Sequence, residues 1–184
     1  MFNDKRSKKV VFVSHCILNQ NTKLDACAHY PGAIREMAEV IFGADIGIIQ
    51  MPCPEFLYLG LDREADYGTR PTVEFEDTRI AGRMTEEKAR CLCKLIIEDM
   101  MHQMMEYREF GFDIAGLVGI NGSPTCGVET TWYDGEEHDG PGVFINMLSE
   151  ELEKNNLHIK MVGIKALDPQ EAVLKTKRLL LTDC

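Results

Sequence analysis

The sequence predicts an α/β fold: a single domain over residues 1–184, in which a parallel sheet of about four strands carries helices on both faces. Short uncharged apolar runs alternate along the chain with segments whose apolar residues recur every three or four positions. Apolar runs without alternation are typical of parallel strands that are covered on both faces. The chain length suits one domain with an ordinary hydrophobic core.

Four segments carry the strand pattern, beginning with the β-branched and aromatic run at residues 10–13. The second strand, at residues 46–51, follows a helix pattern that Pro31 opens and Gly43 closes. Strand, helix and strand together make one βαβ unit, whose crossover is right-handed. The two remaining strands are predicted at residues 114–120 and 159–164.

Further helix patterns separate the later strands. Thr85 is expected to cap a long helix with Glu86 and Glu87 in its first turn and a methionine-rich stripe that packs in the core. Helices are also predicted at residues 143–154 and from a capping Asp168 to the chain end. The simplest arrangement is a Rossmann-like sheet with strand order 2-1-3-4, which binds ligands at the carboxyl ends of its strands.

Two long connections are expected to form active-site loops. Residues 54–83 show no clear helix signal, and the short run from Thr72 to Phe75 alternates between polar and apolar residues. The second connection, residues 123–142, carries Trp132, the only tryptophan. Structureless connections longer than about 15 residues are usually functional or disordered. The aromatic and charged content of residues 54–83 favours a lid-like insertion over a linker.

The charge balance restricts the partners. Twenty Lys and Arg stand against thirty Asp and Glu, and the formal net charge of -10 repels nucleic acids and anionic membranes. No run approaches the ~20 apolar residues of a membrane span. The seven cysteines are an odd number, which indicates thiols or metal ligands rather than disulfides. We therefore expect a cytoplasmic protein that acts on a small molecule.

Three cysteines follow three of the predicted strands: Cys16, Cys53 and Cys126. Because the carboxyl ends of parallel strands meet at one edge of a sheet, we expect these thiols to converge. Prolines or a glycine flank Cys53 and Cys126, which is typical of a thiol on a rigid turn. A single cysteine beside a strand is more often a small buried hydrophobe, but three equivalent placements indicate a shared site.

The remaining cysteines lack this placement. Cys91 and Cys93 are two residues apart on a helix and point to different faces, and Cys93 falls on the core stripe. Cys184 is expected at a frayed chain end. Cys27 lies in the loop after Cys16, from which it could approach the same site as a ligand or resolving thiol.

Three thiolates without a fourth obvious partner suit two kinds of metal centre. One is zinc with an open position, and the other is an iron–sulfur cluster with one iron not bound by protein. His15 could complete a Cys3His zinc site if the first strand has ended before it. A metal-free nucleophilic cysteine is disfavoured, because no loop rich in backbone amides or arginine follows any of the three.

The segments Cys53-Pro54-Glu55 and Ser123-Pro124-Thr125-Cys126-Gly127, each after a strand and preceded by Cys16, resemble the thiouracil desulfurase family, formerly a domain of unknown function. The resemblance covers roughly residues 10–127. The loops that follow Cys16 and Glu55 depart from the family's usual pattern. The chain is therefore similar to a divergent, desulfidase-like branch of that family.

The resemblance implies a [4Fe-4S] cluster held by Cys16, Cys53 and Cys126, with one iron open to the sulfur of a thiocarbonyl substrate. It also implies hydrolytic removal of sulfur from a small thiolated compound, such as a thio-nucleobase, without net redox change. By motif position, Glu55 is the acid–base residue and Ser123 the hydroxyl that anchors the substrate. Two other functions stay open: a non-catalytic zinc-binding module, and a cluster protein that stores or transfers sulfur.

Overall fold

Four parallel strands form the central sheet of the computed structural model, which describes residues 2–181. The spatial order is β2-β1-β3-β6, which confirms the predicted α/β sheet with its first strand beside the second and third. The sheet is of the open Rossmann-like kind, with its switch point between β1 and β3. The strands are β1 (Lys9–Ser14), β2 (Gly47–Met51), β3 (Asp113–Ile120) and β6 (Met161–Ile164).

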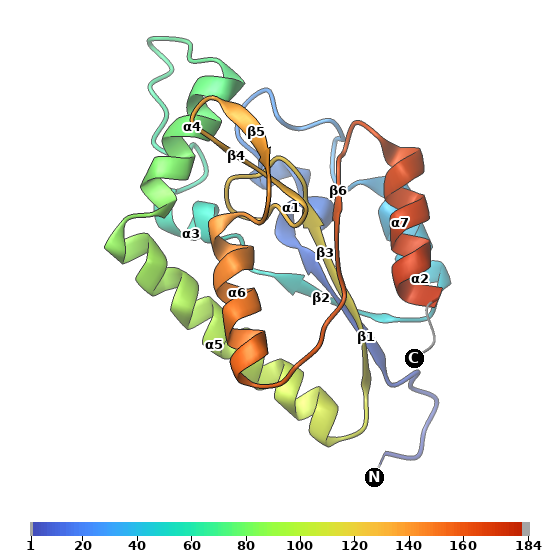
Figure 1. Cartoon of the computed structure of the whole chain (residues 1–184). Helices are drawn as coiled ribbons and strands as arrows, with labels where there is room; N and C mark the ends of the chain where they lie inside the picture. Colours follow the sequence, from blue (N-terminus) through green and yellow to red (C-terminus); the bar gives the residue numbers. More distant parts are fainter. Residues whose placement is uncertain (1, 182–184) are drawn as a thin grey trace.

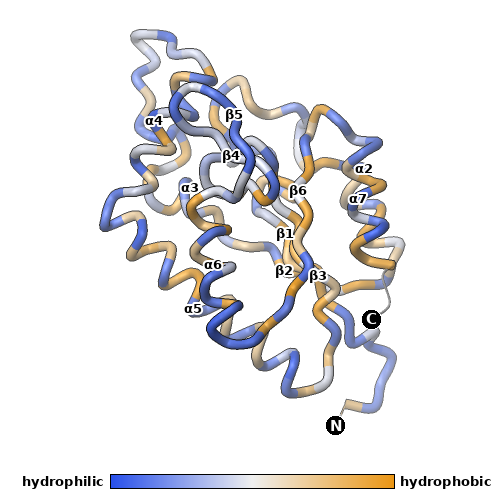
Figure 2. The backbone as a smooth tube through the Cα atoms, in the orientation of Figure 1, coloured by the Kyte–Doolittle hydropathy of each residue, from blue (hydrophilic) through white to orange (hydrophobic). Residues whose placement is uncertain are grey.

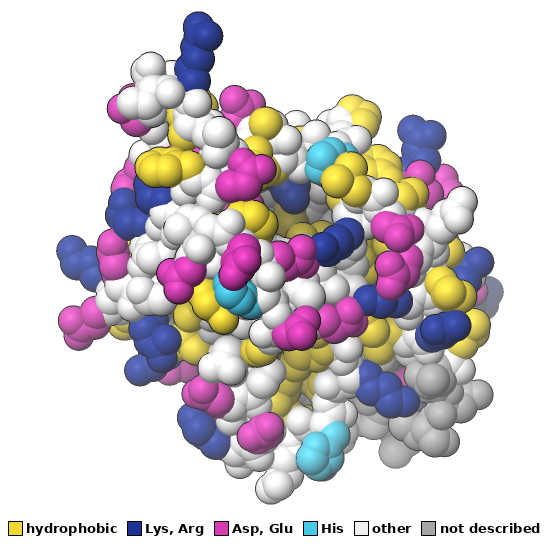
Figure 3. Space-filling model, turned by 45° about the horizontal axis from the view of Figure 1, so that its top comes forward, with side chains coloured by type: hydrophobic (Ala, Val, Ile, Leu, Met, Phe, Trp, Pro, Cys, Tyr) yellow, Lys and Arg dark blue, Asp and Glu magenta, His cyan; other side chains and the backbone are white. Residues whose placement is uncertain are grey.

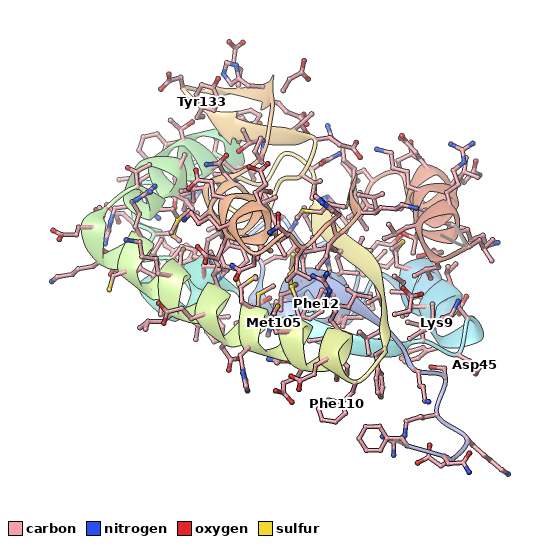
Figure 4. All side chains as sticks on the ribbon, turned by 60° about the horizontal axis from the view of Figure 1, so that its bottom comes forward. Lys9, Phe12, Asp45, Met105, Phe110 and Tyr133 are labelled. Atoms are coloured by element: carbon pink, nitrogen blue, oxygen red, sulfur yellow. The ribbon has the colours of Figure 1, made fainter. Side chains whose placement is uncertain are left out.

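Helices cover both faces of the sheet, as the sequence predicts (Figure 1). Side chains of β1 alternate between the two layers: Phe12 packs with α5 and α6, whereas Val11 and Val13 pack with α2 and α7. Phe12 lies near the centre of the molecule, far from Tyr133 at one end and Phe110 at the other (Figure 4). The covering helices are α2 (Arg35–Gly43), α5 (Glu87–Glu109), α6 (Val143–Lys154) and α7 (Pro169–Leu181).

Several predicted details are confirmed. The helix at residues 143–154 is α6, and the Asp168 carboxylate accepts a hydrogen bond from the Glu171 N–H at 3.0 Å, which caps α7. The methionine-rich stripe of α5 is buried, with Met100, Met104 and Cys93 almost inaccessible to solvent. The strands of the central sheet are mostly hydrophobic, whereas hydrophobic and hydrophilic residues alternate along the covering helices (Figure 2). Cys184 lies outside the described residues.

The segment at residues 54–83 is not a structureless loop, so that prediction is wrong. It contains α3 (Pro54–Leu59) and α4 (Val73–Met84), joined by turns. Thr72 is the N-cap of α4, and its hydroxyl accepts a hydrogen bond from the Phe75 N–H at 3.2 Å. The alternation after Thr72 therefore marks the exposed first turn of a helix.

Two helix starts also differ from the prediction. Helix α2 begins at Arg35 rather than at Pro31, because residues 31–34 form a bend whose Ile34 N–H bonds to the Ile17 carbonyl at 2.9 Å. Thr85 is the C-cap of α4 and not the N-cap of α5, which begins at Glu87. The Thr85 hydroxyl donates to the Gly82 carbonyl at 2.7 Å and so serves the helix that precedes it.

The second long connection is also more ordered than predicted. Residues 123–142 include an antiparallel hairpin, β4 (Thr130–Tyr133) with β5 (Glu136–Asp139). This hairpin lies beside α4 at the carboxyl-terminal edge of the sheet (Figure 1). In the part of the chain that is described, no helix is both long and apolar enough to cross a membrane.

Candidate functional site

A cavity of about 270 Å3 opens at the carboxyl ends of the strands, where the sequence predicts the site. Cys16, Cys53 and Cys126 all line it, so the three strand-end thiols do converge. Cys16 lies in the short helix α1 (His15–Leu18), Cys53 is the N-cap of α3, and Cys126 lies in the loop after β3. This face of the molecule is hollowed, with hydrophobic side chains inside the hollow and charged ones around it (Figure 3).

The loop that carries Cys126 is fixed by its own backbone. The Ser123 hydroxyl oxygen accepts hydrogen bonds from the Thr125 N–H at 3.2 Å and the Cys126 N–H at 3.0 Å. A side chain at Gly127 would place its Cβ only 2.1 Å from the Thr130 carbonyl oxygen, so only glycine fits there. Ser123 therefore has the turn-forming role, and among residues 2–181 its hydroxyl donates no hydrogen bond.

Cys53 is tied to the same site by two donors. Its sulfur accepts the Phe56 N–H at 3.5 Å and faces the Arg63 guanidinium, whose Nη2 lies 3.7 Å away. Pro54 occupies the first position of α3, where its missing N–H costs nothing and its fixed φ favours the helix. The Cys-Pro-Glu segment thus starts a helix with its sulfur directed into the cavity.

Burial dominates the titration of the thiols. It raises the pKa of Cys53 to about 12 and that of Cys126 well above its ordinary value, and it raises the pKa of Cys16 as well. The nearby Cys53 and Cys16 raise the pKa of Cys126 further. Because a nucleophilic cysteine needs a stabilised thiolate, these surroundings disfavour the metal-free nucleophile.

Arg63 is a residue of the candidate site that the sequence analysis missed. Its side chain is 2% exposed, and its guanidinium donates to the carbonyls of Gly60, Leu61 and Thr22. Its Nε lies 3.3 Å from the Glu55 carboxylate, which is 16% exposed. Arg63 therefore holds Glu55 in place and brings positive charge to Cys53 and Cys16.

Arg63→Met should destabilise the protein by about 3 kcal/mol or more, since it leaves the largely buried Glu55 charge and three backbone carbonyls without their partner. Arg83→Met is the matched control, because Arg83 pairs at the surface with Glu64 and Glu86 and should cost less than about 1 kcal/mol. Urea denaturation of both variants measures the difference. Equal losses would contradict the structural role of Arg63.

Two further groups reach the cavity from segments that the sequence analysis left open. Cys27 lines it, and burial raises the pKa of this thiol to about 11, with the Asp77 carboxylate as the next cause. Asp77, on α4, lines it as well, and burial raises its pKa to about 7. No sequence motif marked Asp77, because its position depends on a helix that the sequence analysis did not predict.

Asp77→Asn should stabilise the protein increasingly as the pH rises. The folded carboxyl has a pKa of about 7 against 3.8 ordinarily, so its favourable contribution is complete below pH 3.8 and lost as the pH passes about 7. The variant should gain about 2 kcal/mol over the native protein at pH 8, allowing for solvent screening, and almost nothing at pH 4. Urea denaturation at both pH values, with Glu98→Gln at an exposed position of α5 as control, checks this. A gain that is independent of pH would contradict it.

His15 does not complete the site. It begins α1, so the first strand has ended before it, but its ring does not line the cavity and instead contacts Phe56 with ring centroids 6.4 Å apart. Burial, and then Arg63, lower its pKa. Among residues 2–181, no group of three or more His, Cys, Asp or Glu side chains is arranged to hold a single metal ion.

Comparison with known proteins places the chain among its relatives. No family model matches it, and no solved structure matches it significantly. It is 32% identical over 157 residues to the uncharacterized protein MJ0003 of Methanocaldococcus jannaschii, and the match covers 85% of this chain and 86% of that protein. The two chains therefore correspond along most of their lengths and not at one motif alone. This chain belongs to the same family as MJ0003.

Proposed function

We propose that the chain is an iron–sulfur-dependent desulfidase, which hydrolyses the C=S bond of a small thiolated compound. The observation that carries the proposal is the convergence of three strand-end thiols on one cavity, beside a carboxylate held by a buried arginine. The motif resemblance to thiouracil desulfurases points to the same chemistry. A simple thiol store would have no need of the paired carboxylate.

The donor set fits a [4Fe-4S] cluster. Cys16, Cys53 and Cys126 supply sulfur only, which is the ligand type that such clusters require, and Arg63 supplies compensating positive charge. The cavity that they line provides the space at the sheet edge. When bound, such a cluster supplies a Lewis-acidic iron with an open position for sulfur.

Glu55 handles the proton of the attacking water. Its carboxylate is in the first turn of α3, two residues after Cys53, and the Arg63 contact limits its freedom. One water is consumed, the C=S bond is replaced by C=O, and hydrogen sulfide leaves. No electrons are gained or lost, so the reaction needs no external oxidant or reductant.

Ser123 and the apolar walls of the cavity position the substrate. Both lone pairs of the Ser123 hydroxyl are engaged by backbone N–H groups, which leaves its proton to donate to a substrate. Trp132, Ile80 and Ile120 line the same cavity and give it an apolar surface. A small ring with a polar edge suits this combination better than a long or highly charged substrate.

Hydrosulfide release from a panel of thiolated bases and thioamides, measured under anaerobic conditions, tests this function. We expect turnover by the cluster-loaded protein and none after removal of the cluster. A cluster without turnover of any compound would indicate sulfur storage or transfer instead. Zinc without acid-labile sulfide would indicate a non-catalytic zinc module.

A further inference from the structure

Asp77 lies in the cavity wall without a protein partner. Within residues 2–181, no hydrogen bond or ion pair reaches its carboxyl group, whereas the neighbouring Glu76 pairs with Arg79. A carboxyl group that is partly withdrawn from water without gaining a partner loses part of its hydration free energy. Its place on the wall of the candidate site indicates that a ligand supplies the missing partner.

The position of Asp77 is fixed by the residue that follows it. The Trp132 indole N–H, from the β4–β5 hairpin, donates to the Thr78 hydroxyl on α4 at 3.0 Å. The same hydroxyl donates to the Glu74 carbonyl one turn earlier at 2.8 Å. These bonds join the two segments that cover the cavity, so the carboxyl group and the indole form one rigid wall.

The groups around Asp77 allow it to take part in hydrogen bonding in either protonation state. Burial is the main cause of the raised pKa of Asp77. The Glu55 carboxylate raises this pKa further, and the Lys23 ammonium group lowers it. Near neutral pH both forms of the carboxyl group are present, and each can accept a hydrogen bond. The charged and titratable groups that face it are Glu55, Lys23, Cys27, Glu74 and Glu76.

We propose that Asp77 determines the specificity of the cavity, by accepting a hydrogen bond from a ring N–H next to the thiocarbonyl carbon while the ring packs against Trp132. The inference rests on the proposed function and narrows its substrate class to cyclic thioamides and thioureas with a free N–H. A site that pairs a buried acceptor with this N–H rejects analogues that lack it, because the acceptor is then left unpaired.

Binding of two oxygen analogues tests the inference without turnover. Uracil carries ring N–H groups beside its carbonyls, and 1,3-dimethyluracil carries none. We expect the cluster-loaded native protein to bind uracil about 10-fold or more tightly than the dimethyl compound by titration calorimetry. Asp77→Ala should reduce this preference to less than about 3-fold, while the surface variant Glu98→Ala on α5 should retain it.

Two results would overturn the inference. One is equal affinity of the native protein for the two compounds. The other is an unchanged preference in Asp77→Ala, which would mean that the methyl groups are excluded by shape alone. Absence of hydrosulfide release would count against the proposed function, whereas the Asp77-dependent preference in binding would still hold, so the two failures are distinguishable.

Discussion

Cys126→Ser is expected to abolish cluster binding and, with it, all hydrosulfide release. The thiol lies on a loop whose shape is set by Ser123 and Gly127, which fixes the position of this ligand. A serine hydroxyl is a hard and weakly acidic ligand that iron in a sulfur cluster binds poorly. Iron content, acid-labile sulfide and the visible spectrum of the reconstituted variant measure the loss. Cys16→Ser and Cys53→Ser should behave in the same way.

Cys91→Ser is the matched control for these variants. Cys91 is exposed on α5, away from the cavity, and the same chemical change there should leave cluster content and activity within about 20% of the native protein. Circular dichroism establishes that each variant is folded. Full cluster content in any of the three cavity variants would remove that cysteine from the ligand set.

Glu55→Gln is expected to lower kcat by a factor of about 100 to 10,000 while the cluster is retained. The amide keeps the size of the side chain and an oxygen for Arg63, but it cannot take a proton from water. Because the change leaves the three thiols in place, the visible spectrum and iron content should equal those of the native protein. Single-turnover release of hydrosulfide separates this chemical step from product release.

Glu64→Gln provides the control for Glu55. Glu64 is an exposed carboxylate that pairs with Arg83 outside the cavity, so its replacement should leave kcat unchanged within about 2-fold. Native kcat in Glu55→Gln would show that another group moves the proton. Loss of the cluster in Glu55→Gln would instead assign Glu55 and Arg63 a structural role.

The sequence predicts the cysteine site well because each thiol follows a strand directly. Local apolar runs locate the strands, and parallel strands bring their carboxyl ends to one edge, so Cys16, Cys53 and Cys126 meet without further information. Two further positions are also explained by their local surroundings. Pro54 starts helix α3, and Gly127 allows a close backbone contact. These are short-range features that the sequence carries by itself.

The remaining site residues could not be predicted, because long-range packing places them. Arg63 has a positive φ of 57°, which no turn motif in the sequence predicts. Its guanidinium contacts Thr22, Cys53 and Glu55, which lie elsewhere along the chain. Helix α4 was missed because its buried face is short and partly charged, with Glu76 beside Ile80 and Met84. The Thr72 cap and the acidic first turn of α4 were the signals that could have located it.

The most direct test of the central claim is the iron and acid-labile sulfide content of native protein that is purified and reconstituted without oxygen. The account predicts about four irons and about four sulfides per chain, with the visible absorption of a [4Fe-4S] cluster. Zinc alone, or protein without metal after reconstitution, would contradict it. The three converging cysteines would then be a zinc site or plain buried thiols.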